Sequence, residues 1–485
     1  MTSVTQTLRK RPDFVTFGIF LGLVAIGWLM IFTVGYEDGY TMANFLGTPV
    51  GKQTIWIGIS FFAFFMMQLV SWKFWQSFAY PIYIFTLFLL IAVLFFGANI
   101  KGAMSWFRFG GFTIQPSELA KVGTCLAMAA FLGNYNTDLK QLRWQLIGVS
   151  IMAAPILLIL LQPDAGSALV FTSFLIVFYR AGFPASYYVI GFYSVAVLIL
   201  GLVSAPFDLI QWLILLAMVI MSTNFRPKIY GLLTAVVFAA GVIFLHRNLP
   251  EYDWYIFGGT LLAAVVLSVV LWQRRKQKEV SLLIGAVLLG SVLALGANFG
   301  FNKLLPHQQD RINVWLRPHL TNDKEAGYNL ANSKMAIGAG GLEGKGFLNG
   351  TLTRGGYVPE QMTDFIFCTI GEEQGFVGSM AVIILFLLLL YRLTIIAERQ
   401  RTDFVRYYAY GVAGIIFVHF FINIAMTMGL MPIIGIPLPF ISKGGSSLLG
   451  FSIMLAIILK MDQSSINRFN PPSQLPRVSY YHHGF

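Results

Sequence analysis

Charged residues are scarce in this sequence, and cysteine is almost missing. Asp, Glu, Lys and Arg together make up 11% of the 485 residues, while 57% are hydrophobic. This balance lies far outside that of soluble globular domains. The two cysteines, Cys125 and Cys368, stand in apolar surroundings, and two such residues can build neither a metal cluster nor a disulfide framework. The scarcity of charge excludes a separate soluble domain and indicates an integral membrane protein.

The sequence also lacks the short motifs of several common enzyme classes. The glycine-rich segment GLEGKG, residues 341–346, does not have the GxxxxGK(S/T) spacing of a phosphate-binding loop. No Ser-His-Asp or Cys-His arrangement can be picked out, and His246 and His307 have no metal-ligand spacing. His419 falls inside an apolar run, where we expect it to form a hydrogen bond between helices.

Apolar runs long enough to cross a bilayer fill most of the chain. About 20 residues of helix span a hydrocarbon core roughly 30 Å thick. We therefore predict an all-α polytopic membrane protein with about 14 transmembrane helices, in which residues 1–485 form one domain. The predicted spans are 14–35, 53–72, 77–97, 117–133, 145–162, 166–181, 185–204, 207–223, 229–246, 254–273, 281–300, 377–397, 406–428 and 443–461.

Basic residues exceed acidic ones by 33 to 21, and their positions argue against a nucleic-acid partner. When the spans are counted from the N-terminus, every basic cluster falls on the same side of the membrane. Because Lys and Arg favour the cytoplasmic side, both termini are predicted to be cytoplasmic. The clusters lie at residues 9–11, 140–143, 226–228, 274–278 and 399–406.

One connection is much longer than the others. With this topology, residues 301–376 are predicted to form an extracytoplasmic loop, and they contain eight of the 21 acids. A loop of this length in a compact membrane protein is usually functional, and the glycines of residues 337–350 indicate tight turns. Four of the acids lie in the stretch 356–375: Glu360, Asp364, Glu372 and Glu373.

Three features outside this loop also suggest a site. Pro116 suits the first turn of a helix, and Glu118 lies where the positive end of the helix dipole favours an acid. Lys121 is three residues further on, so Glu118 either pairs with it or contacts a substrate. Asp164 precedes an apolar run and is expected to cap a helix. Three prolines in residues 431–447 prevent a regular helix, and broken backbone at membrane depth lines a cavity or is buried in protein.

Five blocks of sequence then carry a resemblance: SWFRFGGFTIQPSELAK (105–121), LQPDAGSALV (161–170), GYNLANSKMAIGAGGLEGKGFLNGT (327–351), YVPEQMTDFIFCTIGEEQGFVG (357–378) and MPIIGIPLPFISKGGSS (431–447). Together they resemble the SEDS family of shape, elongation, division and sporulation proteins. GKGFLNGT and the YVPE that follows it look more like the RodA branch, which builds the side wall, than the FtsW branch of the septum. The family usually has ten spans, so the segments at 206–300 are interpreted as about four inserted helices.

The resemblance implies that the protein polymerises peptidoglycan glycan strands in the bacterial inner membrane. The implied substrate is lipid II, a disaccharide-pentapeptide on undecaprenyl diphosphate. Because the donor sugar is α-linked to diphosphate and the product is β-linked, a single displacement with inversion suffices. This step needs a carboxylate as base and cations to stabilise the leaving diphosphate. Lys and Arg or a divalent cation, Mg or Mn, would supply that charge, and no organic cofactor is expected. The implied partner is a class B penicillin-binding protein, with other membrane proteins of the elongation complex as further candidates.

The family's essential acid lies in the large outer loop, a few residues before a GYN-like motif. Here the segment reads LRPHLTNDKEAGYN (316–329), and Asp323 is the predicted catalytic base. It stands one residue closer to GYN than in the family pattern. Glu325 and Asp310 are therefore kept as alternative bases, whereas Asn322, at the ungapped position, cannot take up a proton.

The matching blocks also imply substrate-binding residues. Glu118 and Lys121 would line the central cavity, with Lys121 near the diphosphate, and Trp106 and Arg108 would shape its outer mouth. The acids of residues 356–375 are expected mainly to order the loop, through bonds to residues such as Arg354 and Lys345, or to hold a cation. The predicted set is Glu118, Lys121, Trp106, Arg108, Glu360, Asp364, Ser442, Gly444, Gly445 and Ser446, the last four in the segment that closes the cavity.

Two other functions stay open from the sequence. A lipid II flippase, or a related transporter, would use intramembrane charges and the broken segment 431–447 as its moving parts. No inverted repeat is evident, however, and the acids gather in one outer loop. A non-catalytic scaffold for partners in wall synthesis is the third reading, and the altered surroundings of Asp323 keep it open.

Overall fold

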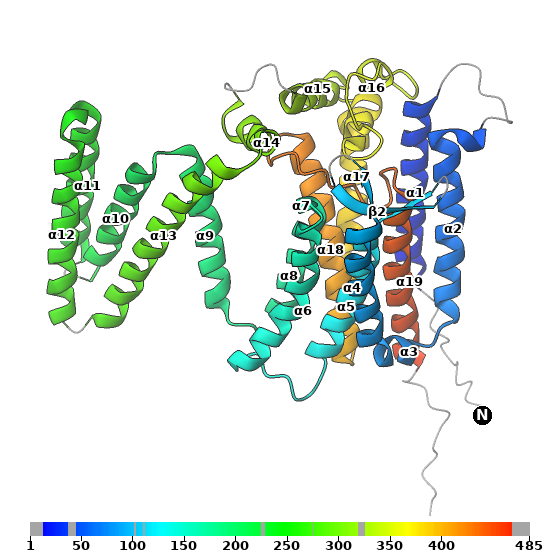
Figure 1. The fold of residues 1–485 in the computed structure, drawn as a ribbon, viewed down its shortest axis with the longest axis horizontal. Helices are drawn as coiled ribbons and strands as arrows, with labels where there is room; N and C mark the ends of the chain where they lie inside the picture. The colour runs from blue at the N-terminus through cyan, green and yellow to red at the C-terminus, as the bar shows by residue number, and fades with distance from the viewer. Residues whose placement is uncertain are drawn as a thin grey trace, which may run out of the picture. The chain divides into compact units, whose positions relative to one another are not determined.

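The computed structural model describes residues 13–36, 45–100, 103–109, 112–224, 228–274, 276–318 and 325–467. They fall into two compact units, which are described separately. Unit 1 consists of the described residues within Met1–Pro184 and Glu325–Phe485, and unit 2 of those within Ala185–Lys324. Both are built mainly from helices (Figure 1).

The helix starts of unit 1 follow from local chemistry. Asp13 caps α1 by accepting a hydrogen bond from the N–H of Thr16 at 3.1 Å, and Thr48 caps α2 in the same way, with Pro49 in the first position. The helices of unit 1 are α1 (Phe14–Gly35), α2 (Pro49–Leu69), α3 (Trp72–Ser77), α4 (Ala79–Phe96), α5 (Pro116–Leu132), α6 (Leu142–Leu160), α7 (Ala165–Val170), α8 (Phe174–Arg180), α15 (Glu325–Ala339), α16 (Thr351–Arg354), α17 (Ile366–Glu398), α18 (Asp403–Thr427) and α19 (Gly445–Asn467). Short 3-10 turns lie at Phe45–Gly47 and Phe171–Ser173.

Helix α18 lies at the centre of unit 1. In the apolar 18-residue stretch of α18, 78% of the residues are buried inside the protein, whereas the figure for the corresponding stretch of α1 is 39%. It packs against α5, α8 and α17, while α2 packs along α19. The start of α5 and the irregular segment before α19 also meet α18, because His419 of α18 contacts both Lys121 and the carbonyl oxygen of Pro437.

A small antiparallel sheet, which the all-α prediction did not include, leads into α5. Its strand order is β1-β2-β3, with β1 at Ala98–Ile100, β2 at Ala103–Phe109 and β3 at Phe112–Ile114. The strands are rich in aromatic residues such as Trp106 and Phe107, which favour extended backbone. Within the residues that the structure describes, the sheet is a local addition to helices and their connections.

Helix α17 is interrupted at Gly375, whose φ of 62° suits glycine. The interruption frees backbone groups on both sides, and the glycine-rich segment 341–346 supplies their partners. Gly341, Gly344 and Gly346 have positive φ, which confirms the predicted tight turns. The bonds join Phe376 N to Gly341 O (2.9 Å), Val377 N to Leu342 O (3.2 Å), Lys345 N to Glu372 O (3.0 Å) and Gly346 N to Glu373 O (2.9 Å).

Unit 2 contains the region that was interpreted as an insertion, and it begins earlier, at Ala185. Helix α13 packs against α9 and α10, and α10 also packs against α11 and α12. In the apolar 18-residue stretch of α11, only 6% of the residues are buried, so most of the surface of this helix is exposed. The helices are α9 (Ala185–Val203), α10 (Pro206–Ser222), α11 (Lys228–Asn248), α12 (Asp253–Gln273), α13 (Gln277–Lys303) and α14 (Pro306–Leu316), with a 3-10 turn at Pro250–Tyr252.

Eleven helices in the described part of the chain are long and apolar enough to cross a membrane. Two further apolar segments, Ala165–Arg180 and Pro206–Ser222, are shorter. The span predicted at 117–133 is α5, which is buried along almost its whole length. The protein is a multi-pass membrane protein, and the predicted number of about 14 crossings stays a prediction.

Candidate functional site

Unit 1 encloses a polar cavity of about 280 Å³. Its walls come from the sheet, the starts of α5 and α7, α18, and the segments 363–364, 434–437 and 443–447. Carboxylates of three residues line it, Glu118, Asp164 and Asp364, together with Lys443. The other polar lining residues are Trp106, Gln115, Ser167, Thr363, His419, Ser446 and Ser447. Five of the ten predicted substrate-binding residues thus line one cavity: Glu118, Trp106, Asp364, Gly444 and Ser446.

Glu118, Lys121 and His419 form a buried polar network beside this cavity. Nζ of Lys121 lies 2.8 Å from Oε2 of Glu118, so the ion pair, one of the two alternatives open from the sequence, is formed. The same ammonium donates to Nε2 of His419 at 3.0 Å, and Nδ1 of His419 lies 3.1 Å from the carbonyl oxygen of Pro437. A lysine ammonium can only donate, so His419 accepts at Nε2 and carries its proton on Nδ1, which donates to Pro437. The hydrogen-bonding role expected for His419 is thereby confirmed.

The two charged residues of this network, Glu118 and Lys121, have different positions relative to the cavity. Lys121 is only 1% exposed, and the ring of Phe451 covers it, with the ring centroid 5.0 Å from Nζ. Glu118 lines the cavity, and although its Oε2 is close to Lys121, the angle there is not that of a hydrogen bond. Glu118 therefore faces the cavity while Lys121 holds it from behind.

Asp164 caps α7, as predicted, by accepting a hydrogen bond from the N–H of Ser167 at 3.0 Å. Its second oxygen accepts from Nε2 of Gln115 at 2.9 Å, and this amide also lies 3.2 Å from Oγ of Ser167. Gln115 immediately precedes α5, so one side chain connects the starts of α5 and α7 in the cavity wall. It was not selected from the sequence, where its place before the helix-starting Pro116 was the available signal.

Residues 431–444 form neither helix nor strand, as their prolines predicted. Ser442 closes a turn in which its Oγ accepts from the N–H of Leu438 at 2.8 Å. The N–H of Gly444 donates to Oε1 of Gln53 in α2 at 3.3 Å. At Gly445 a Cβ would lie 2.0 Å from the ring of Trp56. Glycine is therefore what lets the start of α19 approach α2 at the edge of the cavity.

The other predicted residues of the outer side have different surroundings. Trp106 lies in β2 and lines the cavity, whereas Arg108, two residues further along the strand, is exposed. Glu360 is exposed, with its Oε2 accepting from Oγ1 of Thr363 at 3.1 Å. The main chain of Asp364 is fixed to α18, because its carbonyl oxygen accepts from Nδ2 of Asn423 at 2.9 Å.

Glu372 orders the outer loop. Its side chain is fully buried, and its oxygens accept from the N–H groups of Thr351, Leu352 and Thr353 at 2.8–2.9 Å. Nζ of Lys345 lies 2.6 Å from Oε1 of Glu372, so the expected bond to Lys345 is made by this acid. The carboxylate thus holds the start of the short helix α16, where helix N–H groups need acceptors. Arg354, also expected to bind an acid, donates to the carbonyl oxygen of Leu348 at 2.7 Å.

The predicted base, Asp323, lies outside the described residues, as does Asn322. Of the two alternatives, Glu325 begins α15 and Asp310 lies in α14. In the part of the chain that the structure describes, no three His, Cys, Asp or Glu side chains lie close enough to hold a metal ion. Cys125 and Cys368 are both free and buried, in agreement with the sequence.

Comparison with known proteins gives a match along almost the whole chain. The sequence pattern of FtsW, RodA and SpoVE, described as "Cell cycle protein", matches residues 14–213 and 207–467. The chain is 30% identical to the peptidoglycan glycosyltransferase RodA of Treponema pallidum over 452 residues, which cover 93% of this chain and 97% of that protein. It is 28% identical to the peptidoglycan glycosyltransferase MrdB of Escherichia coli strain K12 over 443 residues, or 90% and 91% of the two chains.

Two solved structures share the fold. One is a chain from "Structural coordination of polymerization and crosslinking by a peptidoglycan synthase complex", with a TM-score of 0.61, 22% identity, and coverage of 94% of this chain and 99% of that one. The other is the rod shape determining protein RodA of Thermus thermophilus, with a TM-score of 0.54, 20% identity, and coverage of 94% and 98%.

Proposed function

The chain belongs to the family of cell cycle proteins that contains FtsW, RodA and SpoVE, and from this premise we propose that it is a peptidoglycan glycosyltransferase. The names of the relatives from T. pallidum and E. coli support this activity. The proposed reaction is inverting transfer between lipid II molecules, which lengthens a glycan strand. The likeness to RodA supports a role in cell elongation and cell shape.

The polar cavity of unit 1 is the observation that carries the proposal. Glu118, Asp164, Asp364 and Lys443 line one space in a chain of which only 11% is charged. Ionisable groups among membrane helices are costly and mark functional sites. Sugar hydroxyls and a diphosphate are ligands that such a mixed set of acids, hydroxyls and a base would bind.

In the proposed reaction a carboxylate removes the proton from the acceptor hydroxyl as its oxygen attacks the anomeric carbon of the donor. The new glycosidic bond forms on the face opposite the bond to diphosphate, which breaks with its electron pair on the diphosphate oxygen. Inversion at the anomeric carbon follows, and no covalent enzyme intermediate is needed. Asp323 remains our proposed base, with Glu325 and Asp310 as the alternatives.

The described residues suggest how the cavity would serve this step. Glu118, held by Lys121, would accept hydrogen bonds from sugar hydroxyls. Because Lys121 is enclosed, Lys443, which lines the cavity, is the better candidate to contact the diphosphate. A divalent cation, Mg or Mn, would enter with the diphosphate, since Mg²⁺ is commonly held by one or two carboxylates together with substrate phosphates. No organic cofactor is required.

We further propose a class B penicillin-binding protein as crosslinking partner, in the bacterial inner membrane, with both termini cytoplasmic. The description of the structural relative, which names polymerization and crosslinking together, supports such a partner. The gathering of Lys and Arg at one set of helix ends supports the orientation.

Purified protein with its crosslinking partner, lipid II and a divalent cation tests the proposal. Glycan strands should form, and Asp323→Ala should slow their formation by about 10²–10⁴-fold, as loss of a general base does. Asn322→Ala is the matched control and should keep activity. If Glu325→Gln abolished strand formation while Asp323→Ala did not, Glu325 would be the catalytic base. Lipid II translocation in vesicles without strands would instead support the flippase, and neither activity would support the scaffold.

A further inference from the structure

Unit 2 contains an apolar groove that the proposed function does not use. Helices α10, α12 and α13 form its walls, and its volume is about 510 Å³. Pockets for small ligands have volumes of about 300–1,000 Å³. Of the sixteen side chains that line the groove, only those of Ser268, Trp272 and Gln273 carry a nitrogen or oxygen atom. The hydroxyl of Ser268 is satisfied within the wall, because it donates to the carbonyl oxygen of Ala264 at 2.7 Å.

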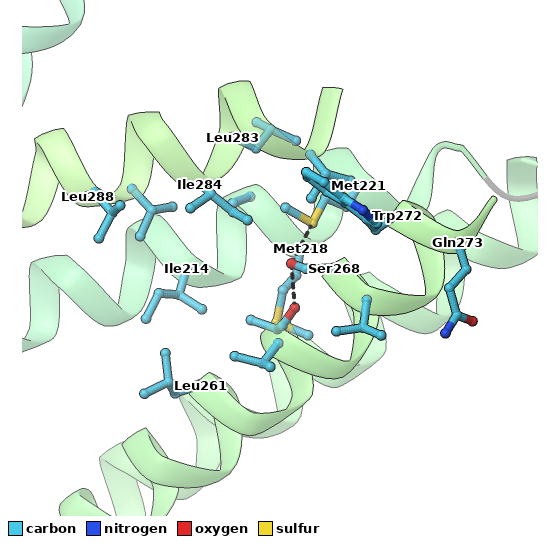
Figure 2. A pocket seen from close by; sticks show the side chains of 16 residues that line it. Ile214, Met218, Met221, Leu261, Ser268, Trp272, Gln273, Leu283, Ile284 and Leu288 are labelled. Carbon is cyan, nitrogen blue, oxygen red and sulfur yellow. Dashed lines mark hydrogen bonds between the residues drawn. The ribbon is translucent and has the colours of Figure 1, made fainter. Parts of the chain in front are cut away.

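The two ends of the groove differ in chemistry. Figure 2 shows Trp272 and Gln273 at one end and Leu288 at the other. Tryptophan is enriched where a membrane meets water, and Trp272 is 47% exposed. Basic residues surround the same end of the helices. Among the described residues, the exposed bases there are Lys228, Arg274, Lys276 and Lys278, and the nearby acid Glu279 pairs with Lys276 at 3.2 Å.

The floor of the groove is closed by a contact between two of its walls. Helices α10 and α12 touch there, with Oγ of Ser268 3.7 Å from Sδ of Met221. A membrane helix is about 10–12 Å across with its side chains, so a groove of about 510 Å³ is too small to hold one along its whole length. A hydrocarbon chain is thin enough to follow the floor from Trp272 toward Leu288.

We propose that this groove binds an acyl chain of an anionic phospholipid, with the phosphate headgroup at the basic end beside Arg274, Lys276 and Lys278. The apolar walls account for the chain, and the bases account for the charge, since basic clusters beside membrane helices attract anionic lipids. With the orientation proposed above, the lipid belongs to the cytoplasmic leaflet. This site is distinct from the polar cavity and does not depend on glycosyl transfer.

Two double variants of α12 test the groove. Val265 and Val269 line it and are 52% and 51% exposed, while Leu262 and Val266, also four residues apart, lie outside it and are 67% and 55% exposed. The full-length protein is purified in detergent and given phosphatidylglycerol or phosphatidylcholine with identical acyl chains, and native mass spectrometry counts the lipid retained. Phosphatidylglycerol should be retained in preference. Val265→Trp/Val269→Trp should weaken this retention about tenfold or more, and Leu262→Trp/Val266→Trp should leave it unchanged.

A second pair of variants tests the charge. Lys276→Ser/Lys278→Ser should reduce the preference for phosphatidylglycerol by about tenfold. Arg247→Ser/Lys303→Ser, at the opposite ends of α11 and α13, should not. Equal retention of the two lipids by the unaltered protein would overturn the proposal, and so would equal loss in both Trp variants. If the groove retained no lipid and the Val265→Trp/Val269→Trp variant instead lost a bound protein, the groove would be a docking surface for a helix of that protein, and the lipid proposal would be wrong.

Discussion

The ammonium of Lys121 donates to Nε2 of His419 across 3.0 Å, between residues 298 positions apart in the chain. This bond fixes the histidine tautomer. Together with the ion pair to Glu118, it means that the lysine ammonium interacts with protein side chains on the inner side of the cavity wall. A lysine at this place therefore organises the cavity wall from behind, and the side chain in contact with the cavity is Glu118.

Loss of Lys121 alone should be much more harmful than loss of the whole ion pair. Lys121→Met leaves the buried Glu118 carboxylate without its cation, which should cost about 3–5 kcal/mol of unfolding free energy. Glu118→Gln/Lys121→Met removes both charges and should recover most of that cost. The midpoint of thermal unfolding of the purified variants measures this. Additive losses in the double variant would contradict the coupling.

Two neighbouring glycines before α19 should respond differently to a methyl group. Gly445→Ala places a Cβ against the ring of Trp56, and such overpacking should cost about 1–3 kcal/mol or more. Gly444→Ala meets only Cβ of Ser447 at 3.5 Å, an ordinary contact, and should be close to neutral. Thermal unfolding compares the two variants. If Gly445→Ala is no worse than Gly444→Ala, or if Trp56→Leu does not relieve it, the close approach is wrong.

Glu372 should control the local stability of the outer loop. Glu372→Gln removes the charge that binds Lys345 and three backbone N–H groups, and should cost about 3 kcal/mol. Hydrogen exchange should become faster at the amides of residues 351–353. Glu360→Gln, an exposed acid of the same loop, is the control and should leave those amides protected. Unchanged exchange in Glu372→Gln would remove the anchoring role.

Asp13 should contribute to stability only above acid pH. Burial acts to raise the pKa of its carboxyl, but the N–H of Thr16 and the guanidinium of Arg392, 2.7 Å away, outweigh it and hold the pKa below 3.8. Because the folded pKa is the lower one, the contribution is present above the unfolded pKa and is lost as the pH falls through the folded value.

Asp13→Asn should therefore flatten the acid side of the stability profile. Thermal unfolding measured from about pH 3 to pH 7 should show a smaller loss on acidification than in the unaltered protein. Asp403→Asn, an exposed acid paired with Arg406, is the control and should keep the full acid-side loss. A profile for Asp13→Asn that matches this control would contradict the prediction.

The parts of the fold that depend on local patterns could be predicted from the sequence. Helix positions follow from apolar length, the Glu118–Lys121 pair from a spacing of three, and the cap at Asp164 from its place before an apolar run. The small sheet was not predicted, because strands as short as Phe112–Ile114 exist only through their pairing. The bond between Lys121 and His419 and the fit of Gly445 to Trp56 are long-range contacts without a local signal. Asp323 rests on the family resemblance alone and stays a prediction.

The break in α17 at Gly375 has a consequence for how the chain is made. The glycine-rich segment 341–346 leaves the ribosome before the helix that it completes. A backbone group left unpaired against lipid is costly, and the acceptors for Phe376 and Val377 lie in that earlier segment. The second part of α17 therefore gains its full set of backbone hydrogen bonds only once the outer loop has folded against it, so the loop and this span depend on each other to fold.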